Sequence, residues 1–313
     1  GEGEMIPVLD FNEFRNGDKA SFTDKLGVAC RDTGFFVLTG HGIDPRLRQK
    51  TFDAAASFFG QGDAAKEALS ITQSPHNRGY SRIGQEFLDE HSGVTDSKEA
   101  FNVGLDLAPD DPRILEGEPF RGVNVWPQVP GFRDTILAWY DAVLALGVEL
   151  HQAIAMDLGL QPRYFDGHLD APLATLRLLR YPAATGAAGE IGAGEHTDYG
   201  SITLLTTDGV PGLQVRPRGG TWIDVPQVSD GCIINIADAL MRWTNDIYVS
   251  TPHRVLPPPA ERYSLAFFLD PNPDSVIQAL PGTGAAKYPP VTGAAYLAQR
   301  LNATYEHKFG ETA

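Results

Sequence analysis

The chain has 313 residues, of which 42% are hydrophobic and 21% are charged, a composition typical of a globular protein rather than a disordered one. Its formal net charge of -15 argues against a nucleic acid partner or an anionic membrane surface, because both would repel it. The sequence contains no run of about 18 apolar residues, so it predicts no membrane span. Two distant cysteines without a pairing motif indicate a reducing compartment. We therefore expect a cytoplasmic protein, whose oligomeric state the sequence leaves open.

The first half of the chain predicts helices around a few short strands. In chain order we expect a strand at 6–9, a helix at 22–33, a buried strand at 34–38, a helix from Pro45 to Phe59, a loop with short strands at 74–111 and a long helix from Pro130 to Leu158. Asp44 is a good N-cap for the helix that begins at Pro45. In the long helix, apolar residues recur at helical spacing.

The second half alternates short strand candidates with glycine and proline breaks. The expected strands are 175–181, 194–206, 212–216, 221–225, 231–236, 247–255 and 262–269, followed by a helix from Val291 to about Tyr305. Many short, evenly spaced strands predict a barrel or a sandwich. We expect a single domain in three regions: an N-terminal helical and α/β region (1–173), a β core (174–275) and a C-terminal helical segment (276–313).

His196, Asp198 and the distant His253 are candidate metal ligands. Side chains repeat every second residue along a strand, so His196 and Asp198 point to one face. Two imidazoles and one carboxylate form the facial triad that holds Fe(II) and leaves the opposite coordination positions open. Zinc would also suit these ligands chemically.

Arg262 and Ser264 form a second pair on one face of a strand. An arginine presents a fork of donors that matches a carboxylate, and a serine hydroxyl adds one more donor. The sequence therefore predicts a pocket that accepts a carboxylic acid near the metal.

These motifs stand in an ordered series along most of the chain. The series comprises Gly34-Phe35-Phe36, His41-Gly42-Ile43, Arg78-Gly79-Tyr80, Lys98-Glu99, Trp126-Pro127, Gly194 to Leu205, Gly212 to Val215, Arg242 to Asn245, Ser250 to Val255 and Arg262-Tyr263-Ser264. It resembles the Fe(II)/2-oxoglutarate-dependent dioxygenases of the isopenicillin N synthase-like superfamily. The resemblance implies a mainly β fold with helical decoration and a double-stranded β-helix (jelly-roll) core. It also implies Fe(II), with 2-oxoglutarate and O2 as co-substrates, and favours iron over zinc.

The resemblance assigns roles to the residues around the metal. Arg262 and Ser264 would clamp the distal carboxylate of 2-oxoglutarate, and Tyr181 would offer its phenol to the same group. Leu179 stands where many plant members have an asparagine, so that contact is missing or replaced.

Five further residues are candidate contacts of the co-substrate or the substrate: Arg177, Tyr199, Phe268, Tyr80 and Arg82. Arg177 shares a strand face with Tyr181, and an inward arginine is costly unless it meets an anion. That anion is either the co-substrate, a carboxylate of the substrate, or an acidic side chain of the protein. Tyr199 follows Asp198, Phe268 shares the face of Ser264, and Tyr80 and Arg82 lie in a segment that the resemblance places near the barrel mouth.

The function implied is oxidation, by default hydroxylation, of a C–H bond in a small molecule, with release of succinate and CO2. Three alternatives stay open. One is an oxidase of the same fold that uses no 2-oxoglutarate, as isopenicillin N synthase and aminocyclopropane carboxylate oxidase do. The others are an ethylene-forming enzyme that consumes 2-oxoglutarate itself, and a binding module without turnover.

Overall fold

Two β-sheets form the centre of the protein. The structure is a computed structural model that describes residues 5–86 and 95–309. The larger sheet has the strand order β1 (Val8–Asp10), β2 (Phe35–Thr39), β10 (Cys232–Ile236), β7 (Ile202–Thr207), β12 (Arg262–Asp270), β5 (Leu173–Tyr181), β4 (Glu99–Val103) and β3 (Gly79–Ser81). The smaller sheet has the order β6 (Ala193–His196), β11 (His253–Val255), β8 (Leu213–Val215) and β9 (Ile223–Asp224). A short pair, β13 (Val276–Ile277) and β14 (Val291–Thr292), stands apart.

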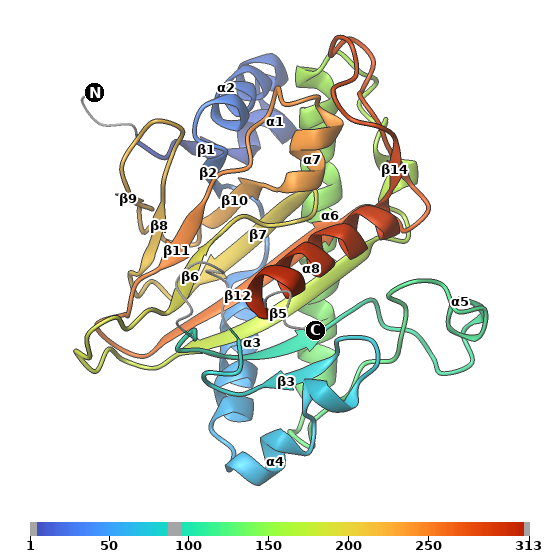
Figure 1. The fold of residues 1–313 in the computed structure, drawn as a ribbon. Coiled ribbons are helices and arrows are strands. Elements are labelled where there is room, and N and C mark those ends of the chain that lie inside the picture. The colour runs from blue at the N-terminus through green and yellow to red at the C-terminus, as the bar shows by residue number, and fades with distance from the viewer. Residues whose placement is uncertain (1–4, 87–94, 310–313) are drawn as a thin grey trace.

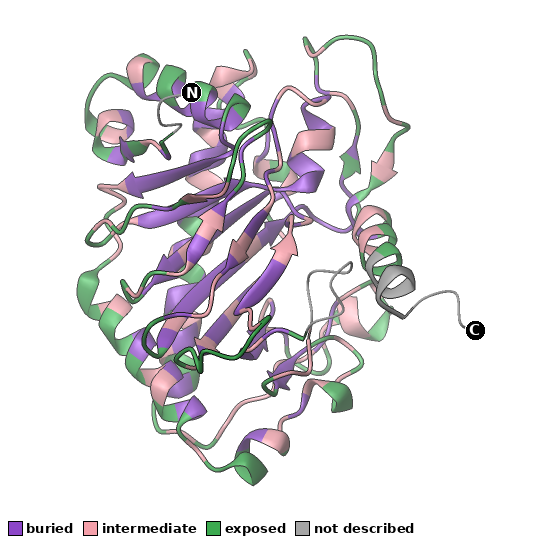
Figure 2. Cartoon of the chain, turned by 60° about the vertical axis from the view of Figure 1, so that its left-hand side comes forward, coloured by how far each residue is buried: buried purple, intermediate pink, exposed green. Residues whose placement is uncertain are grey.

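Helices surround these sheets (Figure 1). They are α1 (Phe11–Asn16), α2 (Lys19–Arg31), α3 (Pro45–Phe59), α4 (Asp63–Glu67), α5 (Pro112–Leu115), α6 (Phe132–Asp157), α7 (Asp238–Trp243) and α8 (Gly293–Phe309), with 3-10 turns at Ile71–Gln73 and Asp166–His168. The strands are largely buried, whereas the helices expose their outer faces (Figure 2). Among the described residues, no helix combines the length and apolarity that a membrane crossing needs.

The larger sheet buries both of its faces, and strand alternation sorts the side chains between them. Leu176 and Leu178 of β5 join the main core with the helices, whereas Leu179 and Tyr181 join the core between the two sheets. Val215 and Val255 reach that second core from the smaller sheet, among others. Two facing sheets with their own core are the predicted jelly roll.

The predicted elements differ from the structure at several places. The short helices α1, α4, α5 and α7 and the strands β13 and β14 were not predicted, the expected strand 194–206 is two strands, and only 253–255 of the expected strand 247–255 is extended. The break between β6 and β7 has a tertiary cause. The first amides of α7 donate to the carbonyl groups of Asp198, Tyr199 and Gly200, so this segment caps a helix instead of joining a sheet.

Helix α6 packs closely on the larger sheet at Gly147. A Cβ atom at this position would lie 2.7 Å from Leu269 Cδ2 and 3.3 Å from Leu204 Cδ1. Leu269 and Leu204 are themselves almost fully buried, on β12 and β7. Glycine therefore sets the distance between the helix and the strands that carry the site.

We expect Gly147→Leu to lower the free energy of unfolding by about 1–3 kcal/mol, because added methylene groups overpack this contact. Urea denaturation followed by circular dichroism measures the change. Gly167→Leu is the control, since nothing lies within 4 Å of a Cβ there. Equal stability of the two variants would show that the helix can move away from the sheet at no cost.

Candidate active site

The three predicted metal ligands meet at one end of the smaller sheet. His196 ends β6, His253 begins β11, and the antiparallel pairing of these strands puts the two residues opposite each other. Asp198 lies two residues beyond His196, with its Oδ1 3.6 Å from His196 Nε2 and 3.3 Å from His253 Nε2. One ligand atom from each residue falls within 4.8 Å of the others. This donor set and spacing fit a divalent iron ion.

Neighbouring groups orient each ligand. His196 Nδ1 donates to the Gly194 carbonyl at 2.7 Å, and His253 Nδ1 donates to the Thr251 carbonyl at 3.0 Å. Because a carbonyl only accepts, each Nδ1 carries a hydrogen, and Nε2 is the atom of each ring that would bind the metal when it is deprotonated.

The Asp198 carboxylate is held by its other oxygen. Oδ2 accepts from Thr203 Oγ1 at 2.6 Å and from Asn235 Nδ2 at 2.9 Å. Oδ1 therefore stays directed toward the two imidazoles. Contacts of this kind fix a ligating carboxylate and tune its metal affinity.

The pKa values of the two histidines are shifted in opposite directions. Burial, helped by the neighbouring His253, lowers the pKa of His196 to about 3. Burial also acts to lower the pKa of His253, but the Asp198 carboxylate more than offsets it and the net pKa is raised. The pKa of Asp198 lies well below its usual value because its contacts with His253 outweigh burial. Asp198 is therefore ionised, and His196 neutral, at physiological pH.

Arg262 and Ser264 lie on β12, where the register sets Arg262 opposite Tyr181. Arg262 is 1% exposed, and its guanidinium carbon lies 5.0 Å from the centre of the Tyr181 ring. Its Nε donates to the Val210 carbonyl, and no carboxylate of the described residues forms an ion pair with it. Ser264 Oγ is buried without a hydrogen-bond partner in the described part of the chain. A buried cation and an unused hydroxyl side by side fit the carboxylate of a bound acid.

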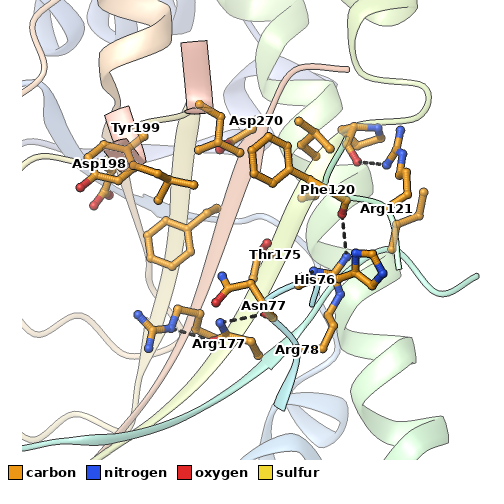
Figure 3. A pocket seen from close by; sticks show the side chains of 18 of the residues that line it. His76, Asn77, Arg78, Phe120, Arg121, Thr175, Arg177, Asp198, Tyr199 and Asp270 are labelled. Atoms are coloured by element: carbon orange, nitrogen blue, oxygen red, sulfur yellow. Dashed lines mark hydrogen bonds between the residues drawn. The ribbon is translucent and has the colours of Figure 1, made fainter. Parts of the chain in front are cut away.

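A cavity of about 480 Å³ opens beside the metal ligands. His196 and Asp198 are among the residues that line it. Asp198 and Tyr199 lie on one side of the cavity, and Arg121 and His76 lie on the opposite side (Figure 3). A molecule bound here would contact the metal centre directly.

Arg177, Tyr199 and Phe268, three of the five candidate contact residues, line this cavity. The charge of Arg177 is met by the protein: its Nη2 donates to Glu86 at 2.8 Å, and its Nε donates to Asn102 Oδ1 at 2.8 Å. Of the partners considered for Arg177, the structure has the acidic side chain. The Arg177 and Lys98 charges hold the pKa of Glu86 down to about 2 against the effect of burial.

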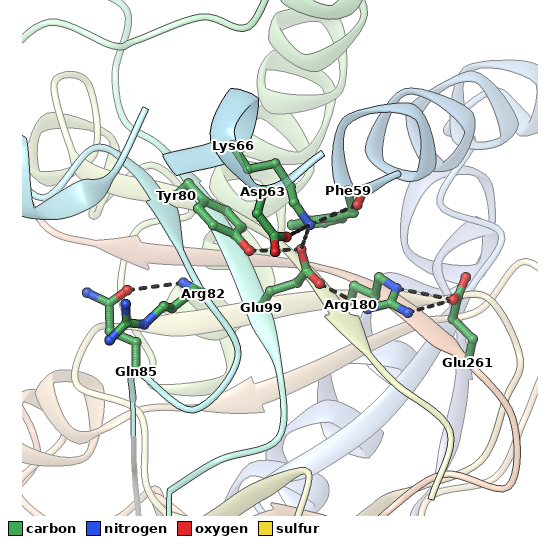
Figure 4. A network of polar contacts seen from close by, with 9 residues as sticks. All are labelled: Phe59, Asp63, Lys66, Tyr80, Arg82, Gln85, Glu99, Arg180 and Glu261. Carbon is green, nitrogen blue, oxygen red and sulfur yellow. Dashed lines mark hydrogen bonds and ion pairs between the residues drawn. The ribbon is translucent and has the colours of Figure 1, made fainter. Parts of the chain in front are cut away.

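Tyr80 and Arg82 are not among the residues that line the cavity, which corrects the expectation for both. Tyr80 is buried and donates to Glu99 at 3.2 Å (Figure 4). Glu99 also pairs with Lys66 and Arg180, both at 2.9 Å. Tyr80 thus belongs to a network that ties α4 to the β4–β5 edge, and the Arg82 side chain is exposed.

Comparison with known proteins agrees with this geometry. Residues 6–129 match the family model of the N-terminal region of the non-haem dioxygenase in morphine synthesis, and residues 171–271 match the 2OG-Fe(II) oxygenase superfamily. A 2-oxoglutarate-Fe(II) type oxidoreductase of Emericella nidulans is 35% identical over 97% of this chain and 90% of its own. The chain belongs to the 2OG-Fe(II) oxygenase superfamily.

Other relatives carry the same co-substrate in their names. A 2-oxoglutarate-dependent dioxygenase of Monascus ruber is 37% identical over 89% of this chain and 88% of its own. A full-length Neurospora crassa protein crystallised with alpha-KG is 36% identical, with a TM-score of 0.87 over 97% of this chain and 98% of that one. The same protein was also crystallised with alpha-KG and thymine. This oxygenase therefore uses Fe(II), 2-oxoglutarate and O2.

Three residues of the site were not predicted from the sequence. Thr203 and Asn235, which hold Asp198, come from strands whose pairing only the fold reveals. Asp270 also lines the cavity of the oxygenase. Two-residue alternation from Arg262 along β12 reaches Asp270, so that signal was present in the sequence.

We expect Thr203→Val to weaken Fe(II) binding by roughly 10–100-fold, because Asp198 loses a donor that orients it. Anaerobic calorimetric titration with Fe(II) measures the affinity. Thr23→Val is the matched control, since Thr23 Oγ1 is buried and without a partner in the described structure. An unchanged affinity would mean that Asn235 alone holds the carboxylate.

Metal binding to the oxygenase should strengthen as pH rises. In the metal-free protein His253 has a raised pKa and must lose its proton to become a ligand. Below that pKa, affinity should fall by up to about tenfold per pH unit, and above it the affinity should level off. Mn(II) titrations at several pH values across and above the ordinary range of histidine test this. A flat profile would contradict a protonated His253 in the metal-free state.

Proposed function

We propose that this oxygenase hydroxylates a C–H bond of a small molecule bound in the cavity beside the facial triad. The observation that carries the proposal is that His196 and Asp198 belong both to the ligand set and to the cavity wall. The volume of about 480 Å³ lies in the ordinary range for small-molecule sites. The thymine complex of the Neurospora crassa protein supports a substrate of this size.

Two separate sets of residues would bind the iron and the co-substrate. His196, Asp198 and His253 would hold the iron, and Arg262, Ser264 and Tyr181 would hold the distal carboxylate of 2-oxoglutarate. With its co-substrates bound, the iron centre supplies an oxidant for a C–H bond as 2-oxoglutarate is converted to succinate and CO2. The protein positions the substrate and keeps water away, for which the walls formed by Phe268 and Tyr199 are suited.

The names of the relatives favour use of 2-oxoglutarate over an oxidase that needs none. Arg262, which has no carboxylate partner among the described residues, supports the same choice. Retention of the whole triad argues against a binding module without turnover. We also propose a cytoplasmic location, which the two buried free cysteines support. The three sequence regions would act as one domain, because β1 to β4 complete the same sheet as β12.

The first experiment is an anaerobic titration of the metal-free protein with Fe(II) and then 2-oxoglutarate. A visible charge-transfer band is expected, since a keto acid chelated to iron absorbs there. Succinate release then screens candidate substrates. Iron binding without the band would contradict the proposal and reassign Arg262 to a carboxylate of the substrate.

Changes to the carboxylate clamp should raise the KM for 2-oxoglutarate. We expect about 10–100-fold for Ser264→Ala, the loss of one hydrogen bond to a charged group, and a larger increase for Arg262→Lys, because an ammonium cannot form the two-pronged contact. Steady-state succinate release measures both. Arg46→Lys is the control, since Arg46 is exposed and pairs only with Asp44 among the described residues. A KM unchanged in both clamp variants would place the co-substrate elsewhere.

A further inference from the structure

A buried carboxyl group at the end of β12 faces the cavity and has no partner among the residues that the structure describes. Asp270 is 9% exposed and lines the cavity. In the described part of the chain its side chain makes no hydrogen bond or ion pair, and Asp198 is the one charged group that acts on it. Burial, followed by repulsion from Asp198, raises the pKa of Asp270 to about 8. An unpaired carboxylate in this place is costly.

Asp270 lies near the level of the metal ligands along β12. Its Oδ1 packs on the backbone of Gly200, where a Cβ atom would overlap it, and Gly200 lies two residues after the ligand Asp198. Phe268, two residues earlier on β12, lies opposite Thr203, the residue that holds Asp198. Asp270 is therefore one strand step beyond the level of the metal, on the same inward face. Figure 3 shows it between Tyr199 and Arg121.

The arginines of the cavity, unlike Asp270, already have partners. Arg177 donates to Glu86 and Asn102. Arg121 pairs with Glu118 and donates to two backbone carbonyl groups. Arg78 donates to two backbone carbonyl groups, although its buried Nε has no hydrogen-bond partner in the described structure. Of the two acids that line the cavity, Asp198 belongs to the triad and Asp270 is left without a partner among the described residues, in a wall that also includes the rings of Phe268 and Tyr199.

We propose that Asp270 recognises a protonated amine of the substrate, so that the molecule oxidised is a small amine whose reacting carbon lies beside the metal. This inference rests on the proposed function, since it puts the substrate in the same cavity. An acid next to aromatic faces is the surface that binds ammonium groups, which gain both a charge-assisted hydrogen bond and a cation–π contact.

Proton release on binding distinguishes an amine cation from a neutral ligand. Burial, the larger cause of the raised pKa, favours the neutral form of Asp270 with or without the metal. When an amine cation binds, this acid loses its proton to solvent, and the carboxylate and ammonium form an ion pair. One proton at most is released for each amine bound. A neutral ligand that accepts a hydrogen bond from Asp270 would leave the acid protonated and release none.

The test compares amines with matched analogues that lack the basic nitrogen. The probes are L-pipecolate against cyclohexanecarboxylate, benzylamine against benzyl alcohol, and thymine as a neutral ring with N–H groups. Succinate release is measured with wild-type holoenzyme, Asp270→Asn and, as control, Asp274→Asn, an exposed acid outside the cavity. We expect at least one amine to exceed its analogue, and Asp270→Asn to raise its KM by about 10–100-fold. The KM for 2-oxoglutarate should change less than about twofold, because the clamp is at the other end of β12.

A binding measurement separates recognition from a structural role. Calorimetry of the anaerobic holoenzyme in two buffers of different ionisation enthalpy should show proton release with wild type and none with Asp270→Asn. The inference is overturned if no amine stimulates turnover, if only neutral probes do so, or if wild type and Asp270→Asn respond alike. Absence of the iron–keto acid band in wild type would instead overturn the proposed function, so the two failures are distinguishable.

Discussion

The antiparallel pairing of β12 with β5 is the constraint on which the site depends. Its register sets Arg262 opposite Tyr181, Ala266 opposite Arg177 and Asp270 opposite Leu173. Since side chains alternate, the inward face of β12 carries the proposed carboxylate clamp at one end and the Asp270 acid at the other, roughly 25 Å of strand apart. The outward residues, such as Leu265 and Phe267, anchor the strand in the core under the helices. A slip of one residue would bury the clamp in that core and turn leucines into the cavity.

The metal site is built across the two sheets. His196 and His253 come from the smaller sheet, whereas Thr203 and Asn235, which hold Asp198, come from neighbouring strands of the larger sheet. The carboxylate of Asp198 therefore joins the sheets as well as presenting an oxygen to the metal. Its loop is held in turn by the amides at the start of α7. The geometry of the triad thus depends on the packing between the sheets, which the second hydrophobic core maintains.

Sequence patterns predicted the parts of the site that are local in the chain. His196 and Asp198, or Arg262 and Ser264, are two residues apart, so strand alternation alone puts each pair on one face. The partner of Arg177 was left open, because Glu86 is 91 residues away and only the folded sheet brings it near. Tyr80 was misplaced for the same reason: its hydroxyl meets Glu99 across the β3–β4 pair. Helix α7 is only six residues long, and its start is fixed by the distant loop that caps it, so no local periodicity predicts it.

The buried ionisable groups around the cavity differ in whether the protein pairs them. The Arg177 guanidinium has a protein carboxylate as its partner, whereas Arg262 and the carboxyl group of Asp270 have none in the described structure. Arg262 carries a buried charge without a counter-ion among the described residues and burial favours the neutral form of Asp270, and both states cost free energy until a ligand pairs with the group. A ligand that binds only the native state and pairs with such a group increases the free energy of unfolding. The two groups are therefore the places where the proposed co-substrate and substrate contacts would add stability to the jelly roll. Because the groups lie at opposite ends of one strand, the two ligands would be recognised separately and would meet only at the metal between them.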